Sequence, residues 1–126
     1  MPPIGLPIIE RLVSLYKLWY EVKEHFPKKS KFTLGAKIDI IFNNILELTL
    51  LAGNLPKDQK LPYLQKAISQ FDLLKFFLRV AWEIKALDNK KYLLISEPLV
   101  EIGKMLGGWK KGLENKTPAN FSRRNS

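Results

Sequence analysis

The sequence has no cysteine and a single histidine, His25, and these shortages argue against most catalytic chemistry. Without cysteine there is no disulfide, thiolate metal site or cysteine nucleophile, which fits a reducing cytosol, and we expect a cytoplasmic protein. A di-iron centre in a helical bundle needs Glu-x-x-His pairs, and no glutamate lies three residues before His25. The nearest preceding arginine, Arg11, is too far away for an Arg–His RNA-cleaving pair. We therefore predict no catalytic residue, metal or cofactor.

Four further patterns are missing. No window of about 18 uncharged apolar residues exists, so no membrane span is predicted. The opening "MPPIGLPII" lacks the basic start of a signal peptide. The segment "GKMLGG" has its lysine in the wrong place for a phosphate-binding loop, and no segment shows the alternation of a strand. The fold class that remains is all-α.

Positive charge is what the chain has in excess: 21 basic residues stand against 12 acidic ones, a net charge of +9. Residues 104–126 hold six Lys/Arg and one Asp/Glu, a net of +5. This balance favours polyanions, mainly nucleic acid or an anionic surface. The alternatives are a basic protein with no such partner and an amphipathic protein that lies on a membrane surface.

The stretch "FPKKSKFTLGAKI" crowds Lys28, Lys29 and Lys31 into a short gap between two helical segments. On physical grounds alone, lysines are common in such a turn because turns are wet. The competing interpretation is a phosphate-binding surface. We expect Phe26 and Phe32, which flank the lysines, to anchor the turn from below rather than to stack on bases.

Apolar residues recur at helical spacing in four segments. Pro27 ends the first segment, "GNLP" ends the second, and Asp88 is a good N-cap for the fourth. Pro98 should kink the fourth helix or restart it at Ser96. The predicted helices cover residues 8–25, 33–52, 58–87 and 88–113.

These helices predict one domain, an antiparallel up-down four-helix bundle over residues 1–116. Residues 117–126, "TPANFSRRNS", have no apolar period and predict a flexible basic tail. The third helix is apolar nearly all round between Phe71 and Trp82. Such a helix needs burial on nearly every side. We therefore predict a second interface that contains Trp82, formed with another subunit.

Glycines in the fourth helix suggest a close helix approach. Glycine costs about 1 kcal/mol in a helix interior, so a compensating contact is expected. Gly103 and Gly107 are four residues apart, and the large aromatic Trp109 follows them. We predict that Trp109 is buried and that Gly107 lies at a helix crossing; the alternative is a frayed helix end.

Four segments stand out together: "FPKKSKFTLGAKI", "NLPKDQKLPYLQKA", "FDLLKFFLRVAWEIKALDNKKY" and "EIGKMLGGWKK". They resemble the accessory variability determinant (Avd) family of diversity-generating retroelements. The resemblance covers about residues 20 to 113, and "LLKFFLRVAW" and "GKMLGGW" carry most of it. It implies a four-helix bundle that assembles into a basic homopentameric barrel. It also implies that this barrel binds the retroelement reverse transcriptase and template RNA and supports mutagenic cDNA synthesis without itself being the polymerase.

The lysine clusters and this resemblance together give the candidate residues. An ion pair of Arg79 with Glu83 or Asp72 remains an alternative role for that arginine. The alternative function is a bundle scaffold of the ribosomal RNA intervening-sequence type, with no specific nucleic-acid role. The candidates for nucleic-acid binding are Lys28, Lys29, Lys31, Lys75, Arg79, Lys104, Lys110 and Lys111. The candidates for structural or oligomer contacts are Trp82, Gly103, Gly107 and Trp109.

Overall fold

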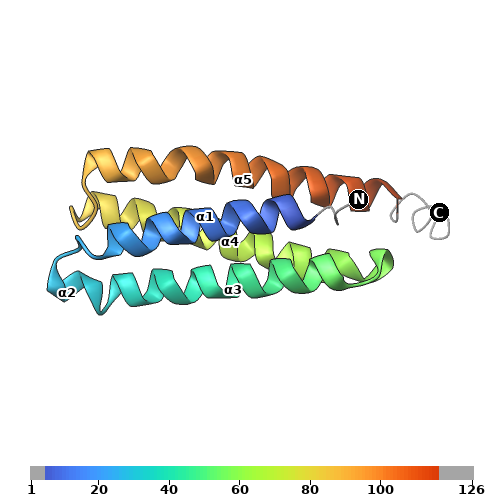
Figure 1. Ribbon diagram of the computed structural model, residues 1–126, viewed down its shortest axis with the longest axis horizontal. Helices are drawn as coiled ribbons and strands as arrows, with labels where there is room; N and C mark the ends of the chain where they lie inside the picture. Colours follow the sequence, from blue (N-terminus) through green and yellow to red (C-terminus); the bar gives the residue numbers. More distant parts are fainter. Residues whose placement is uncertain (1–4, 117–126) are drawn as a thin grey trace.

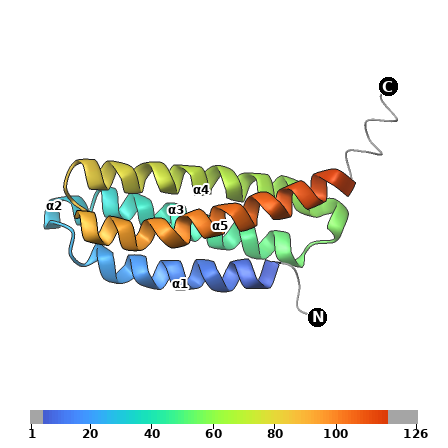
Figure 2. The ribbon, with the colours of Figure 1, turned by 90° about the horizontal axis from the view of Figure 1, so that it is seen from above.

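The structure, a computed structural model, describes residues 5–116, and four long helices dominate this part of the chain. A short helix, α2 (Lys28–Lys31), joins the first two long helices, and a 3-10 turn, η1 (Lys57–Gln59), precedes the third. Consecutive long helices run antiparallel, and the last one packs against the first (Figure 1 and Figure 2). This confirms the predicted all-α bundle, while the predicted tail, residues 117–126, lies outside the described residues. The long helices are α1 (Gly5–Lys23), α3 (Leu34–Asn54), α4 (Lys60–Glu83) and α5 (Asn89–Lys116).

Side chains close two of the helix ends. The Lys60 ammonium donates to the carbonyl oxygens of Ala52 and Gly53, at 2.8 and 3.0 Å, so it satisfies the C-terminal end of α3. Asp88 caps α5 as predicted, because its carboxylate accepts the backbone N–H of Lys91 at 2.8 Å. The Lys91 side chain bonds the same carboxylate, and these bonds hold the pKa of Asp88 below its ordinary value.

The core runs the length of the bundle, and it includes one side of α5. Ile95 rather than Leu94 faces the core, and Leu106 is buried while Met105 is only partly so. Trp109 is 7% exposed, which confirms its predicted burial. The largest fully buried side chains are Trp19, Phe42, Phe71, Leu12, Leu15, Ile38, Ile45, Leu64, Leu74, Leu78, Leu87 and Ile95.

Helix α5 continues across Pro98, which excludes a restart at Ser96, while the alternative outcome, a kink at this proline, stays a prediction. Proline removes one backbone donor and normally bends a helix. Here Ile95 and Leu99, on either side of Pro98, are both buried in the core. Packing of α5 against α1 and α4 therefore holds the helix together where the local sequence favours a break.

The close helix approach occurs at Gly103 and not at Gly107. A Cβ built on Gly103 would lie 3.4 Å from the ring of Phe71 on α4, whereas a Cβ on Gly107 would meet nothing within 4 Å. Gly107 is exposed because it lies one turn further along α5, past the contact with Phe71. The prediction of a crossing at Gly107 within the chain is therefore wrong.

Leucine should destabilise the fold at Gly103 but not at Gly107. Gly103→Leu should lower the free energy of unfolding by about 1–3 kcal/mol, because the new side chain overpacks against Phe71. Gly107→Leu should leave it unchanged or raise it by up to about 1 kcal/mol, because leucine favours a helix over glycine. Urea denaturation at low protein concentration measures both. Equal losses in the two variants would contradict the assigned crossing.

A buried hydroxyl in α3 has no hydrogen-bond partner. Thr49 is fully buried, and its Oγ1 is unbonded. Thr49→Val keeps the shape and removes the desolvated oxygen, so it should raise the free energy of unfolding by about 1 kcal/mol. Thr33→Val is the control: Thr33 is exposed and donates to the carbonyl of Lys29 at 3.0 Å, so no gain is expected there. A loss of stability in Thr49→Val, measured by urea denaturation, would contradict the expectation.

Candidate nucleic-acid interface

The lysine stretch forms a short helix at one end of the bundle. Pro27 precedes α2, and its carbonyl accepts the backbone N–H groups of Ser30 and Lys31, both at 2.9 Å. Phe26 is buried and packs edge-on against Trp19, with ring centroids 5.4 Å apart, which confirms it as an anchor. The same expectation for Phe32 is wrong, because Phe32 is 71% exposed. Of these two rings, only Phe26 fills the core beneath the turn.

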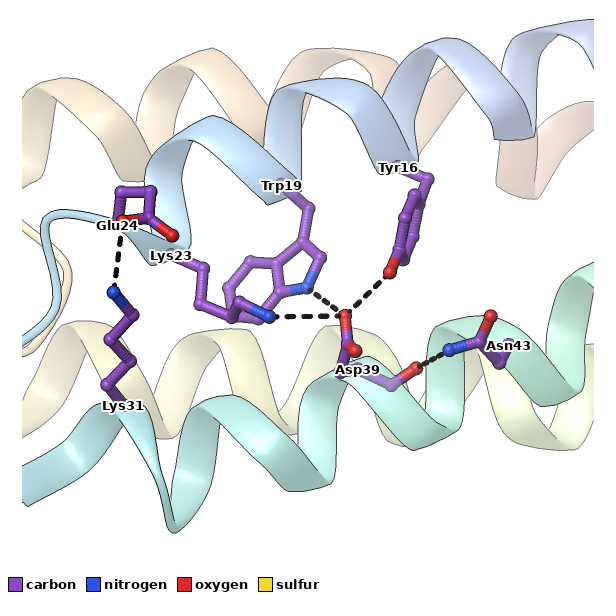
Figure 3. A network of polar contacts seen from close by, with 7 residues as sticks. All are labelled: Tyr16, Trp19, Lys23, Glu24, Lys31, Asp39 and Asn43. Carbon is purple, nitrogen blue, oxygen red and sulfur yellow. Dashed lines mark hydrogen bonds and ion pairs between the residues drawn. The ribbon is translucent and has the colours of Figure 1, made fainter.

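The three lysines of α2 do not share one environment. The Lys31 ammonium lies 3.0 Å from the Glu24 carboxylate, and this bond lowers the pKa of Glu24 (Figure 3). Lys28 and Lys29 are exposed, and neither makes an ion pair within residues 5–116. The corner therefore presents two free ammonium groups and a third that is shared with a carboxylate.

A polar cluster behind the corner ties α1 to α3, and Asp39 is its centre (Figure 3). One carboxylate oxygen of Asp39 accepts the Tyr16 hydroxyl at 2.9 Å and the Trp19 indole N–H at 3.1 Å. The Lys23 ammonium lies 3.8 Å from the same oxygen. Three residues of α1 thus converge on one of α3, which fixes the position from which α2 projects. Sequence reasoning missed Asp39, because a single carboxylate in an apolar stripe resembles an ordinary surface position.

The Tyr16 hydroxyl makes the stability of this cluster depend on pH. Burial, the hydrogen bond to Asp39 and its charge raise the pKa of Tyr16 above the ordinary value of 10.0. The unfolded chain therefore releases the proton first, so the stabilisation is complete below pH 10 and is lost as the pH rises through the folded pKa. Unfolding midpoints across this range should fall more steeply for the wild type than for Tyr16→Phe. Parallel curves would contradict this, since lysine titration is common to both proteins.

The candidates on α4 are engaged in ion pairs along their own helix. Lys75 lies 3.4 Å from Asp72, and the Arg79 guanidinium lies 3.3 Å from Glu83. All four side chains are at least half exposed, so these pairs add little stability and leave the cations accessible. The structure thus contains the Arg79–Glu83 pair that the sequence offered as an alternative.

The remaining candidates lie along α5. Lys104 and Lys75 both line a groove of about 320 Å³ between α4 and α5, beside Gly103. Lys110 is 3.9 Å from Glu114, and Lys111 is exposed. The end of α5 that carries these two lysines lies at the opposite end of the bundle from α2 (Figure 1). The predicted residues therefore occupy the α2 corner, the α4–α5 groove, the exposed surface of α4 at Arg79 and the far end of α5, and not one continuous site within a single chain.

Three lysines that the sequence did not single out lie at the same end of the bundle as α2. Lys85 belongs to the connection between α4 and α5, and Lys90 and Lys91 belong to the first turn of α5 (Figure 1 and Figure 2). Lys85 adopts a positive φ of 66°, which reverses the chain after α4, and its side chain is exposed. Lys90 is also exposed, while Lys91 bonds Asp88. A signal was present in "DNKKY", but only the fold shows that this turn and α2 are at the same end.

Neither metal sites nor membrane spans are found in the part of the chain that the structure describes. Within residues 5–116, no three His, Asp or Glu side chains gather as a metal ion would require. The helices over the same range are too short or too polar to cross a bilayer.

Comparison with known proteins identifies the family. The search of curated proteins found no match. The model of the bAvd-like family matches residues 6–113, which span all four long helices and the α2 corner. This match agrees with the resemblance carried by the sequence segments. The chain therefore belongs to the bAvd-like family.

Proposed function

We propose that this protein is a non-catalytic accessory protein of a diversity-generating retroelement. In this role a basic oligomer binds the reverse transcriptase and the template RNA and supports mutagenic cDNA synthesis. The observation that carries the proposal is the family match over residues 6–113 of a chain with a net charge of +9. The free ammonium groups of Lys28 and Lys29 supply a surface that attracts phosphate.

Exposed apolar side chains support self-association as part of this function. On α4, Leu73, Phe76 and Trp82 are 42%, 54% and 38% exposed. Leu73 and Phe76, three residues apart, lie on one side of α4, and Trp82 is a second exposed apolar site near the end of the helix. Exposed apolar surface of this kind is often buried in an interface. The homopentamer implied by the family resemblance would bury such a surface and repeat each basic corner around a ring. The added positive field would strengthen RNA binding.

RNA retention at several salt concentrations tests the proposal, because phosphate contacts release counterions and log affinity then falls linearly with log salt. Light scattering on the same samples should give a particle mass several times the 14.6 kDa of a single chain. Capture of the retroelement reverse transcriptase by the tagged protein tests the second partner. Absence of salt-dependent RNA binding in a well-folded oligomer would favour the scaffold function, and a monomer at micromolar concentration would refute self-association.

A further inference from the structure

Phe32 is the most exposed large apolar side chain in residues 7–115, at 71%. It directly follows α2, and its backbone angles, φ −90° and ψ −5°, continue the helical course. Residues three and four apart on a helix lie on the same side, so Lys29 and Lys28 lie on the same side of this turn as Phe32. The third lysine, Lys31, is turned toward Glu24, which directly follows α1.

An exposed ring on the same side of α2 as two free cations suits one class of partner. An apolar protein surface that covered Phe32 would also remove the neighbouring ammonium groups from water, which is costly unless each gains an ionic partner. A single-stranded nucleic acid offers a flat base for the ring and phosphates for the cations, without that cost. Sequence-tolerant binding of single strands combines these same two elements, an aromatic platform and a basic groove.

We propose that Phe32 stacks on an unpaired base of a bound RNA strand whose phosphates contact Lys28 and Lys29. This inference rests on the proposed RNA binding and assigns it to single-stranded segments. Paired bases in a duplex are already stacked on each other and cannot use the ring. The corner therefore distinguishes single strands from duplexes by shape and stacking, without reading the base sequence.

Two substitutions at Phe32 separate stacking from plain apolar contact. Phe32→Leu keeps an apolar side chain but loses the flat ring, and Phe32→Tyr keeps the ring. Binding is measured with oligoadenylate of about 12 nucleotides, a length within the range of single-strand sites. Phe32→Leu should weaken binding roughly 5- to 100-fold. Phe32→Tyr should bind like the wild type. Both should keep the wild-type salt slope, because neither changes the number of charges.

Duplex RNA and light scattering complete the test. Phe32→Leu should leave the affinity for a duplex unchanged, and circular dichroism should show an intact fold because the side chain is exposed. Oligoadenylate binding that is indifferent to Phe32→Leu overturns this inference alone, as does a weaker Phe32→Tyr beside a normal Phe32→Leu. A change of oligomeric state in Phe32→Leu would instead assign the ring to an interface between copies. A wild-type protein that binds no RNA overturns both this inference and the proposed function.

Discussion

Alanine at Lys28, Lys29 and Lys31 together should lower the affinity for single-stranded RNA roughly 25-fold at 0.1 M salt. For single strands the salt slope falls by about 0.7 for each phosphate contact, so the loss of the two contacts made by Lys28 and Lys29 removes about 1.4 units, while Lys31 is held by Glu24. At 0.1 M salt this loss of slope corresponds to about 1.4 orders of magnitude in affinity. The fold should survive, because all three side chains lie on the surface of a short solvated helix. Filter retention at several salt concentrations measures the affinity and the slope, and circular dichroism checks the fold.

Two comparisons show whether the loss of RNA affinity comes from the α2 corner itself or only from the lower net charge of the protein. Alanine at Lys104, Lys110 and Lys111 removes the same three charges from α5, and a smaller loss is expected there. An equal loss would mean that binding follows net charge rather than the α2 corner. Glu24→Gln removes the carboxylate that holds Lys31, so it should strengthen binding about 5-fold at 0.1 M salt. Unchanged affinity and slope in the α2 triple variant would show that this corner is ordinary solvated surface.

The second large effect is expected on stability. Trp19→Ala should lower the free energy of unfolding by about 3–5 kcal/mol. Trp19 is fully buried, stacks on Phe42 with ring centroids 6.3 Å apart, and packs edge-on against Phe26. Its loss opens a cavity at the corner end of the core and leaves Asp39 without one of its donors. Since domains are stable by about 5–15 kcal/mol, this variant should be close to unfolding at physiological temperature.

Trp82→Ala is the matched control for this prediction. Trp82 is 38% exposed and stacks on Tyr92 at 5.0 Å, and its indole N–H donates to Asn89 at 2.6 Å. Its removal should cost less than the loss of Trp19 when urea denaturation is measured at low protein concentration. A cost that grows with protein concentration would instead place Trp82 in the subunit interface, because association stabilises by mass action. Equal losses for the two tryptophans at low concentration would contradict the assigned core.

Local signals in the sequence were sufficient for the helices. Apolar spacing located all four long helices, and Asp88 was recognised as a cap because its carboxylate bonds a backbone N–H only three residues away. Trp109 was correctly assigned to the core for a similar reason, since its place in the stripe is set by helical periodicity. The lysines of α2 were found because charge in a short gap is visible without any fold.

Predictions from the sequence failed where contact with a neighbouring helix decides the local structure. Pro98 favours a break locally, yet α5 stays continuous because the buried Ile95 and Leu99 hold both sides of it in the core. Gly103 and Gly107 are equivalent in spacing, and only the position of Phe71 on α4 distinguishes a contact from open solvent. The spacing of apolar residues describes one helix at a time. It does not show which side chains of a neighbouring helix lie opposite each residue.

The sequence by itself determined the helical class, the excess of positive charge and the family, because these depend on residue types and on their order. Tertiary structure alone decided how the candidate site is composed. It buried Phe26 and exposed Phe32 beside Lys28 and Lys29, and it directed Lys31 to Glu24. The physical reason is that the space beneath α2 is limited: Phe26 fills it against Trp19, so the second ring remains in water next to the free cations.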